Sequence, residues 1–171
     1  MKVVNLFGGP GTGKSTTCAA LFAELKYRDY DVEMVREFAK DLVWAGRQPH
    51  MRVPGFILGE QSYRLATVAP KVVVTITDSP ILLSRVYDSN EAQKQLALDV
   101  YNQYENLNIF LQRKKAYNPN GRNETEGEAH QKDREIREML NELNLDYTLL
   151  AADRDAVHHI VDILRDKEWI Q

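Results

Sequence analysis

The stretch LFGGPGTGKSTTC, at residues 6–18, carries glycines and a lysine in the pattern Gly8-x4-Gly13-Lys14-Ser15. It follows an apolar run and opens an amphipathic pattern, which is the strand–loop–helix context of a phosphate-binding P-loop. Glycines allow the backbone to curl so that successive N–H groups face phosphate oxygens, and a helix N-terminus adds partial positive charge. The stretch therefore predicts a site that holds a phosphate.

We expect this loop to bind ATP together with Mg²⁺. Lys14 is expected to reach the β- and γ-phosphates, and the Ser15 hydroxyl is expected to ligate Mg²⁺. The predicted nucleotide-binding residues of the loop are Gly9, Gly11, Thr12, Gly13, Lys14, Ser15 and Thr16.

The composition is that of an ordinary globular protein. Of the 171 residues, 43% are apolar and 27% are charged, which predicts one domain over residues 1–171. The net charge of −3 provides no global basic field for nucleic acid or an anionic membrane, although a local basic patch remains open. The single cysteine, Cys18, and the lack of a long apolar run or signal peptide predict a cytoplasmic protein that does not enter a membrane.

Short β-branched runs alternate with helical patterns along the chain. The predicted strands are residues 2–7, 31–35, 71–78, 107–113 and 146–151. Several of these runs lack polar alternation, as expected for strands covered on both faces. Helices are predicted by apolar periodicity at 18–25, 136–143 and 157–164, and further helices near 37–46, 57–69 and 91–105. This alternation predicts the α/β class, with a mostly parallel sheet between two layers of helices.

Two absences narrow the class of P-loop protein. The guanine-reading tetrapeptide Asn-Lys-x-Asp occurs nowhere in the sequence, which argues against a GTPase switch. Asp78 ends an apolar run but is followed by Ser79 and Pro80, so the second carboxylate of a typical motor or AAA+ ATPase is missing. Hydrolysis therefore lacks its obvious base, whereas transfer to a hydroxyl remains open.

The second predicted strand ends at Arg36 and Glu37, at the sheet edge where open α/β sheets bind ligands. Glu37 is a candidate general base and Arg36 a candidate anion clamp, with Asp41, one turn later, as the alternative carboxylate. A salt bridge or a carboxylate at a helix start is the structural alternative for Glu37. On the next helix, Gln61 could read the edge of a heterocycle with Arg64 on the same face, unless both belong to a solvated helix surface.

Five segments together resemble the small P-loop kinases of the nucleoside and nucleotide kinase superfamily. The resemblance is to the kinase domain of bacterial nicotinamide-riboside kinases and to related phage proteins grouped as AAA-type ATPases, and it covers essentially the whole chain. The segments are residues 8–15, VREFAKDL at 35–42, EQSYR at 60–64, TDSP at 77–80 and NPNGR at 118–122. The resemblance implies a P-loop fold with five parallel strands in the order 2-3-1-4-5 and a lid at about 113–128.

The resemblance also implies roles on the acceptor side. Glu37 resembles the carboxylate that deoxynucleoside kinases use as base, and Gln61 with Arg64 resembles their Q-x-x-R element, whose glutamine contacts the acceptor's base. Asp78 resembles the acidic residue that contacts Mg²⁺ through water or holds the acceptor. The proline after the base carboxylate is replaced here by Phe38, so the acceptor's identity does not carry over from one branch.

On the donor side, Arg113 and Arg122 look like lid arginines over the transferring phosphate. Ala152, within the sequence Ala-Ala-Asp at 151–153, lies where the family holds adenine, largely through the backbone. The alternative to a lid is that the polar segment 113–128 is a solvated surface loop without a role in the site.

The sequence thus predicts an ATP- and Mg²⁺-dependent kinase that phosphorylates a hydroxyl of a small nucleoside- or nucleotide-like acceptor. One alternative is a phage-type DNA kinase that acts on a 5-hydroxymethylpyrimidine base or a polynucleotide end, with Arg113, Lys114 and Lys115 lining the strand path. Another is a regulatory, nucleotide-dependent ATPase. The oligomeric state is left open, a homodimer included.

Overall fold

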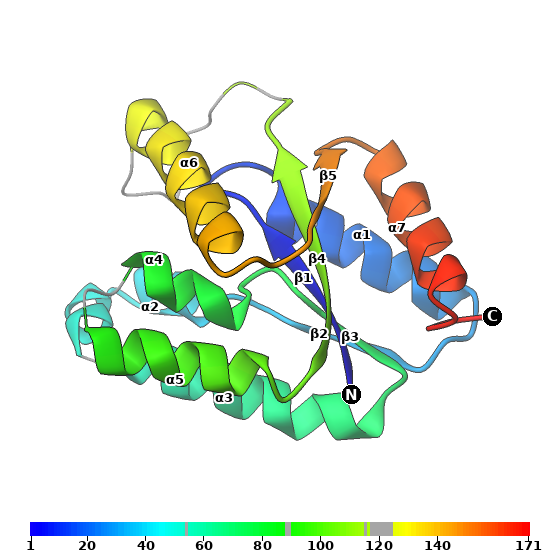
Figure 1. The fold of residues 1–171 in the computed structure, drawn as a ribbon, viewed down its shortest axis with the longest axis horizontal. Helices are drawn as coiled ribbons and strands as arrows, with labels where there is room; N and C mark the ends of the chain where they lie inside the picture. Colours follow the sequence, from blue (N-terminus) through cyan, green and yellow to red (C-terminus); the bar gives the residue numbers. More distant parts are fainter. Residues whose placement is uncertain (54, 88–89, 115, 117–124) are drawn as a thin grey trace.

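The computed structural model describes the whole chain except residues 54, 88–89, 115 and 117–124. Its centre is a parallel sheet in the order β2-β3-β1-β4-β5 (Figure 1). The strands are β1 (Lys2–Phe7), β2 (Val32–Val35), β3 (Val74–Thr77), β4 (Glu105–Gln112) and β5 (Thr148–Ala151). The predicted α/β class and strand order are confirmed.

Helices cover both faces of the sheet, which gives the three-layer arrangement. They are α1 (Lys14–Tyr27), α2 (Phe38–Trp44), α3 (Phe56–Val68), α4 (Ser84–Tyr87), α5 (Glu91–Tyr101), α6 (Glu126–Glu142) and α7 (Asp155–Asp166). Short 3₁₀ turns are η1 (Gln48–Arg52), η2 (Ala69–Lys71) and η3 (Ile81–Leu83). Among the described residues, we find no helix with the length and apolarity that crossing a membrane requires.

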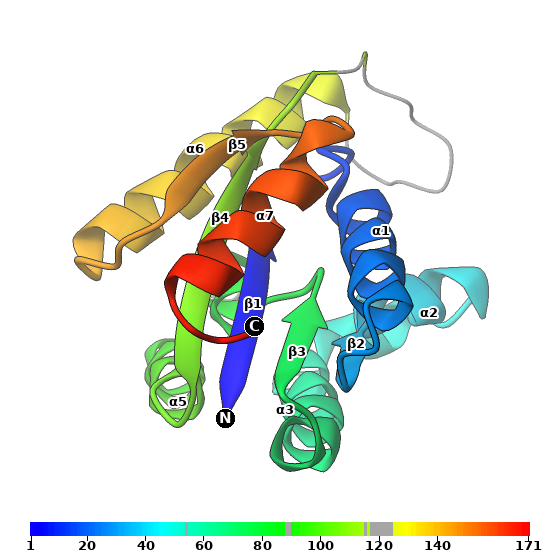
Figure 2. The same cartoon turned by 90° about the vertical axis from the view of Figure 1, so that its right-hand side faces the viewer.

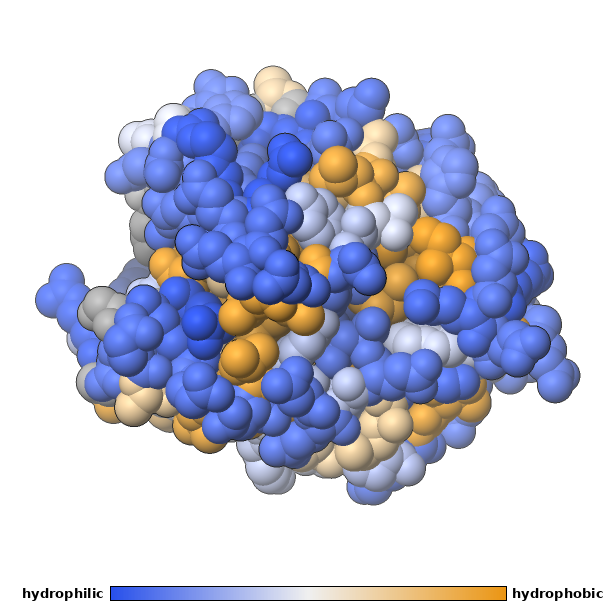
Figure 3. All heavy atoms as spheres, in the orientation of Figure 1, coloured by the Kyte–Doolittle hydropathy of each residue, from blue (hydrophilic) through white to orange (hydrophobic). Residues whose placement is uncertain are grey.

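The two faces of β1 explain why the helices divide as they do. Val4 and Leu6 are fully buried and pack in the core under α1 and α7, which lie side by side (Figures 1 and 2). Val3 and Phe7 point the other way, into cores formed with α3, α5 and α6. The strand is therefore buried on both sides, as its unbroken apolar run predicts. Most of the surface in Figure 3 is hydrophilic, with hydrophobic residues reaching it between α6 and α5.

Several predicted segments have different bounds in the structure. The helix expected near 91–105 ends at Tyr101, and β4 begins at Glu105, two residues before the strand expected at 107–113. The strand expected at 71–78 is β3, which begins only at Val74, because residues 69–71 form the turn η2. Helix α6 begins inside the predicted lid, because Thr125 and Glu128 form a reciprocal capping box at its first turn. The rest of that lid, including Arg122, falls mostly outside the described residues.

The helix that follows the P-loop buries the chain's cysteine. Cys18 is 1% exposed, and burial raises the pKa of its thiol to about 12, with the negative charge of Asp78 adding to the rise. A shift of this size lowers the thiolate fraction at pH 8 by roughly a thousandfold. We therefore expect native protein at pH 8 to resist a thiol-specific chromogenic reagent, and protein unfolded in urea to react at once. Equal rates for the two samples would contradict this burial.

Candidate functional site

The turn between β1 and α1 has the geometry of a phosphate-binding loop. Gly13 occupies the N-cap of α1 with a φ of 107°, and Gly11 has a φ of 76°, both in the region that favours glycine. The first turn of α1 contains no acidic residue, so nothing in that turn opposes the partial positive charge of the helix end. Ser15 and Thr16 are exposed at this end. The loop residues therefore fit a bound polyphosphate.

Lys14 folds back on the loop that precedes it. Its ammonium Nζ donates to the carbonyl oxygens of Gly8, at 2.6 Å, and Gly9, at 3.1 Å. Burial lowers the pKa of Lys14. The carboxylates of Glu37, Asp78 and Asp133 act in the opposite direction and favour the charged form. The cation is thus held beside the loop, where the sequence predicts it.

Neighbouring strands bring Glu37 and Asp78 to one place. Glu37 is the N-cap of α2, two residues after the end of β2, and Asp78 directly follows β3, which pairs with β2 in parallel. The backbone N–H of Glu37 donates to Asp78 Oδ1 at 2.9 Å. Asp78 is only 4% exposed, so its carboxylate fixes the backbone corner that carries Glu37. The prediction that both acids lie at the ligand edge of the sheet agrees with this geometry.

Gln61 braces the same corner from helix α3. Its Oε1 accepts from the Phe38 N–H, and its Nε2 donates to the Arg36 carbonyl, both at 3.3 Å. The residue is 4% exposed and lines the large pocket described below. Since both ends of its amide bind backbone, Gln61 positions the β2–α2 corner, and its predicted contact with a heterocycle stays a prediction.

Arg36, Asp41 and Arg64 form an ion-pair group behind this corner. Arg64 Nη1 lies 3.1 Å from Asp41 Oδ2, and its Nε lies 3.0 Å from Glu60 Oε1. The Arg64 guanidinium also stacks 4.8 Å from the centre of the Phe38 ring. Arg36 is more exposed, with Nη2 3.7 Å from Asp41 Oδ1. Asp41 and Arg64 do not belong to the lining of the pocket, so their predicted substrate contacts also stay predictions.

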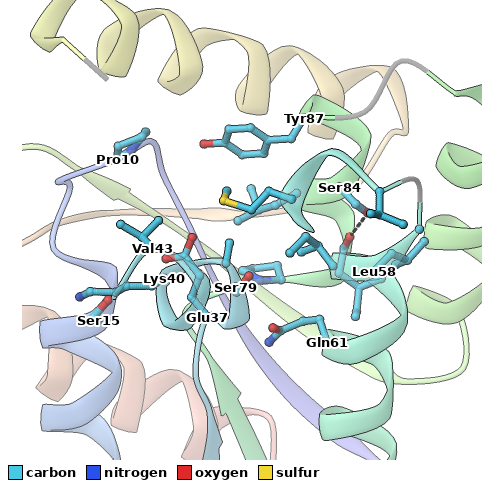
Figure 4. A pocket seen from close by; sticks show the side chains of 18 of the residues that line it. Pro10, Ser15, Glu37, Lys40, Val43, Leu58, Gln61, Ser79, Ser84 and Tyr87 are labelled. Atoms are coloured by element: carbon cyan, nitrogen blue, oxygen red, sulfur yellow. Dashed lines mark hydrogen bonds between the residues drawn. The ribbon is translucent and has the colours of Figure 1, made fainter. Parts of the chain in front are cut away.

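A pocket of about 430 Å³ opens beside the P-loop (Figure 4). At one end lie Ser15, Glu37 and Lys40, and Leu58 and Ser84 lie at the other. The wall between them is built mainly by α2, η1, α3, η3 and α4 and is largely apolar. Its apolar side chains include Val43, Trp44, Met51, Val53, Ile57, Leu58, Ile81 and Leu83. The pocket is therefore large enough for a small organic molecule and adjoins the predicted phosphate site.

A second cavity, of about 140 Å³, lies between α1 and the end of β2. Ser15 and Asp78, the two predicted Mg²⁺ ligands, both line it, and Glu37 lines both cavities. Among the described residues, no group of three or more His, Cys, Asp or Glu side chains could hold a metal. This donor set fits Mg²⁺, which keeps several waters and binds phosphate with only one or two protein oxygens.

Asp133, on α6, is a site residue that the sequence interpretation missed. Its Oδ1 accepts from the Gly9 N–H at 2.5 Å, and its Oδ2 lies 3.0 Å from Arg113 Nη2. Arg113 in turn donates through Nη1 to the Pro10 carbonyl at 2.9 Å. The helical spacing of Asp133 with the buried residues Ala129 and Ile136 is the signal that could have placed it on the inner face of α6.

Of the remaining residues predicted on the ATP side of the site, Ala152 and Arg113 lie at the loop, whereas Arg122 is not described. A Cβ built on Gly13 would lie 3.4 Å from the Cβ of Ala152, so the chain just after β5 borders the loop. Arg113 also reaches the loop, through the Pro10 carbonyl, while its predicted role over the transferring phosphate stays a prediction. Arg122 and Lys115 lie outside the described residues.

Comparison with known protein families gives a match to an AAA domain over residues 3–156. The chain belongs to the AAA domain family. The match spans the loop, all five strands and the corner at Glu37, so the nucleotide-binding P-loop is shared with this family. No curated protein matches the chain at a significant level. AAA domains of this P-loop type bind nucleotides, and their reactions are hydrolysis or transfer of a phosphoryl group.

We predict that Lys14→Met weakens ATP binding by roughly 10- to 100-fold, because an ion-paired hydrogen bond to phosphate is lost while the chain length is kept. A titration with a fluorescent ATP analogue measures this. Lys26→Met, in the last turn of the same helix, is the matched control and should bind as wild type does. Unchanged affinity in Lys14→Met would show that the nucleotide binds elsewhere.

Proposed function

We propose that this AAA domain is an ATP- and Mg²⁺-dependent kinase that transfers the γ-phosphoryl group to a hydroxyl of a nucleoside-like acceptor. The observation that carries the proposal is the pocket of about 430 Å³ beside the P-loop, with Glu37 at the loop end. Hydrolysis needs space only for a water molecule next to the phosphate. A pocket in the size range of small-molecule sites, joined to the loop, supports an organic acceptor instead.

The lining of the pocket favours an acceptor whose body is uncharged. Among its described side chains, only Glu37 and Lys40 carry charge, and both lie at the loop end (Figure 4). The rest of the lining is apolar, with neutral polar groups such as Ser79, Ser84 and Gln93. An acceptor phosphate in the apolar part of the pocket would lose its water without gaining a described cation as partner, which is costly in free energy. A nucleoside-like body therefore suits the pocket better than a nucleotide.

In the proposed reaction, the loop amides and Lys14 bind the phosphates of ATP. Glu37 orients the acceptor hydroxyl and takes its proton as the oxygen attacks the γ-phosphorus. The bond from the γ-phosphorus to the oxygen that bridges it to the β-phosphate then breaks, and ADP leaves. Asp78 holds the Glu37 backbone in place through their hydrogen bond of 2.9 Å. Positioning and charge neutralisation supply most of the rate, since little covalent chemistry is required of the protein.

The bound metal would neutralise the charge that develops on the phosphate oxygens. Ser15 and Asp78 would hold it, directly or through water, because both line the cavity of about 140 Å³ next to the loop.

We predict that Glu37→Gln lowers kcat with the true acceptor by about 10²- to 10⁴-fold, because the amide cannot take the hydroxyl proton. Binding of the ATP analogue should stay nearly unchanged. Glu33→Gln, an exposed position on β2, is the control and should retain full turnover. Nearly full turnover in Glu37→Gln would remove Glu37 as the base.

The acceptor is identified with radiolabelled ATP and a panel of potential acceptors. The panel holds nucleosides, the matching nucleoside monophosphates, nicotinamide riboside, and plain and hydroxymethylated oligonucleotides. We expect label on an uncharged nucleoside-like compound. Label on monophosphates alone would overturn the charge argument but keep the kinase. Rapid ATP hydrolysis with no labelled acceptor would favour the regulatory ATPase.

A DNA acceptor is the second candidate, and the exposed rim of the pocket favours it. Trp44 and Tyr87 line the pocket, yet 73% and 54% of their surfaces are exposed, which suits stacking of bases. Arg47 and Arg52 are exposed close by in sequence, in and beside η1. Arg113, expected on the strand path, has a side chain only 9% exposed and bound to Asp133. Salt-dependent oligonucleotide binding would support this candidate, and no detectable binding would exclude it.

A further inference from the structure

Asp133 occupies a position on α6 where a carboxylate needs partners. Ala129, Ile136 and Leu140 are fully buried, and Asp133 shares their helical face at a spacing of three or four residues. Its side chain is 19% exposed. A charge that is largely removed from water is costly unless it is paired and hydrogen-bonded, so the contacts of Asp133 decide whether it is tolerated.

The hydrogen bonds of Asp133 connect α6 to the P-loop, directly and through Arg113. One carboxylate oxygen accepts the Gly9 N–H, and the other binds the Arg113 guanidinium, which in turn binds the Pro10 carbonyl. Asp133 and Arg113 together therefore bind the N–H of Gly9 and the C=O of Pro10. His130 is a further neighbour, with Nδ1 4.0 Å from Asp133 Oδ2. Two side chains from β4–α6 thus fix the backbone of Gly9 and Pro10.

The approach of α6 to the loop is close enough to require glycine. A Cβ on Gly9 would lie 2.6 Å from the Ala129 carbonyl oxygen and 2.8 Å from Asp133 Oδ1. Gly9 does not have a positive φ, so packing against α6, and not backbone conformation, excludes a side chain there. The loop is therefore seated directly on the helix.

The charge of the pair is also suited to a phosphate site. A lone carboxylate beside the loop would repel a polyphosphate, but the Arg113 guanidinium, 3.0 Å away, neutralises it. The pair can thus hold the loop without adding net negative charge. Since a backbone N–H and a backbone C=O are both bound, the loop resists rotation of the peptide units that precede its phosphate-facing amides.

We propose that Asp133 is a positioning residue for nucleotide binding, which acts with Arg113 as one unit to hold the Gly9–Pro10 backbone in its phosphate-binding form. The inference rests on nucleotide binding by the loop and not on the kinase proposal. Nucleotide affinity is therefore measured without any acceptor.

The test uses Asp133→Asn, which keeps the shape of the side chain but places an amide donor or a neutral oxygen opposite the arginine. We expect affinity for a fluorescent ATP analogue to fall by roughly tenfold, with amide hydrogen exchange faster in the loop peptide. Glu138→Gln, an exposed position on the same helix, makes the same charge change and should leave both unchanged. Melting temperatures of the two variants, without nucleotide, separate loop positioning from general destabilisation.

Arg113→Gln and the double variant complete the experiment. If the two residues act as one unit, Arg113→Gln also weakens binding and the double variant binds no worse than the weaker single variant. Wild-type affinity in Asp133→Asn would overturn the proposal. If Asp133→Asn fails to fold, Arg113→Gln becomes the deciding variant. Wild-type nucleotide affinity in Arg113→Gln would then overturn the proposal. If neither single variant folds, the pair is structural and the proposal fails.

Discussion

The carbonyl groups at the start of the phosphate loop are bound by two cationic side chains of the protein. Lys14 donates to the carbonyls of Gly8 and Gly9, and Arg113 donates to that of Pro10. The two cations thus bind the loop's carbonyl oxygens, whose partial negative charge would repel a phosphate. Strand β1 holds the start of the loop in a fixed position, because the strand is paired on both sides and buried on both faces.

Parallel pairing then determines what surrounds the loop. Since all five strands run in one direction, the segments that follow them meet at a single edge of the sheet. Glu37, Asp78, Arg113 and Ala152 come from the ends of four different strands and reach the loop region there. The corner at Glu37 is held from two directions, by Asp78 and by Gln61. The catalytic proposal depends on that rigidity.

Much of this arrangement could be predicted from the sequence, and the reasons differ by element. The loop is recognisable because its chemistry requires glycine, lysine and a hydroxyl at fixed spacing. The strands are recognisable as apolar β-branched runs, but their order came from the family resemblance, because local sequence does not encode which strands pair. The start of β3 was misjudged, since the apolar residues before it continue the pattern although residues 69–71 form the turn η2.

The partners of polar side chains could not be predicted in the same way. The contacts of Gln61 with the backbone of Phe38 and Arg36 were not predicted, because these residues lie 23 and 25 positions away in sequence. Asp133 was missed because α6 is rich in charged residues; its spacing could have placed it on the inner face, but its role depends on a contact with the loop, 124 residues away in sequence. Such contacts depend on the packing of whole helices, which no local pattern specifies.

The two halves of the site come from different stretches of the chain. Most of the large pocket is lined by residues between Ala39 and Gln93, whereas Lys14, Arg113 and Asp133, which bind the loop backbone, lie outside that stretch. The pocket-forming stretch also contains β3 and Asp78, which belong to the sheet and to the predicted Mg²⁺ site. Substitutions in it can reshape the cavity without touching the Lys14, Arg113 or Asp133 contacts. For the proposed kinase, this architecture would let acceptor preference diverge between relatives, or be re-engineered, while the contacts that hold the loop stay constant.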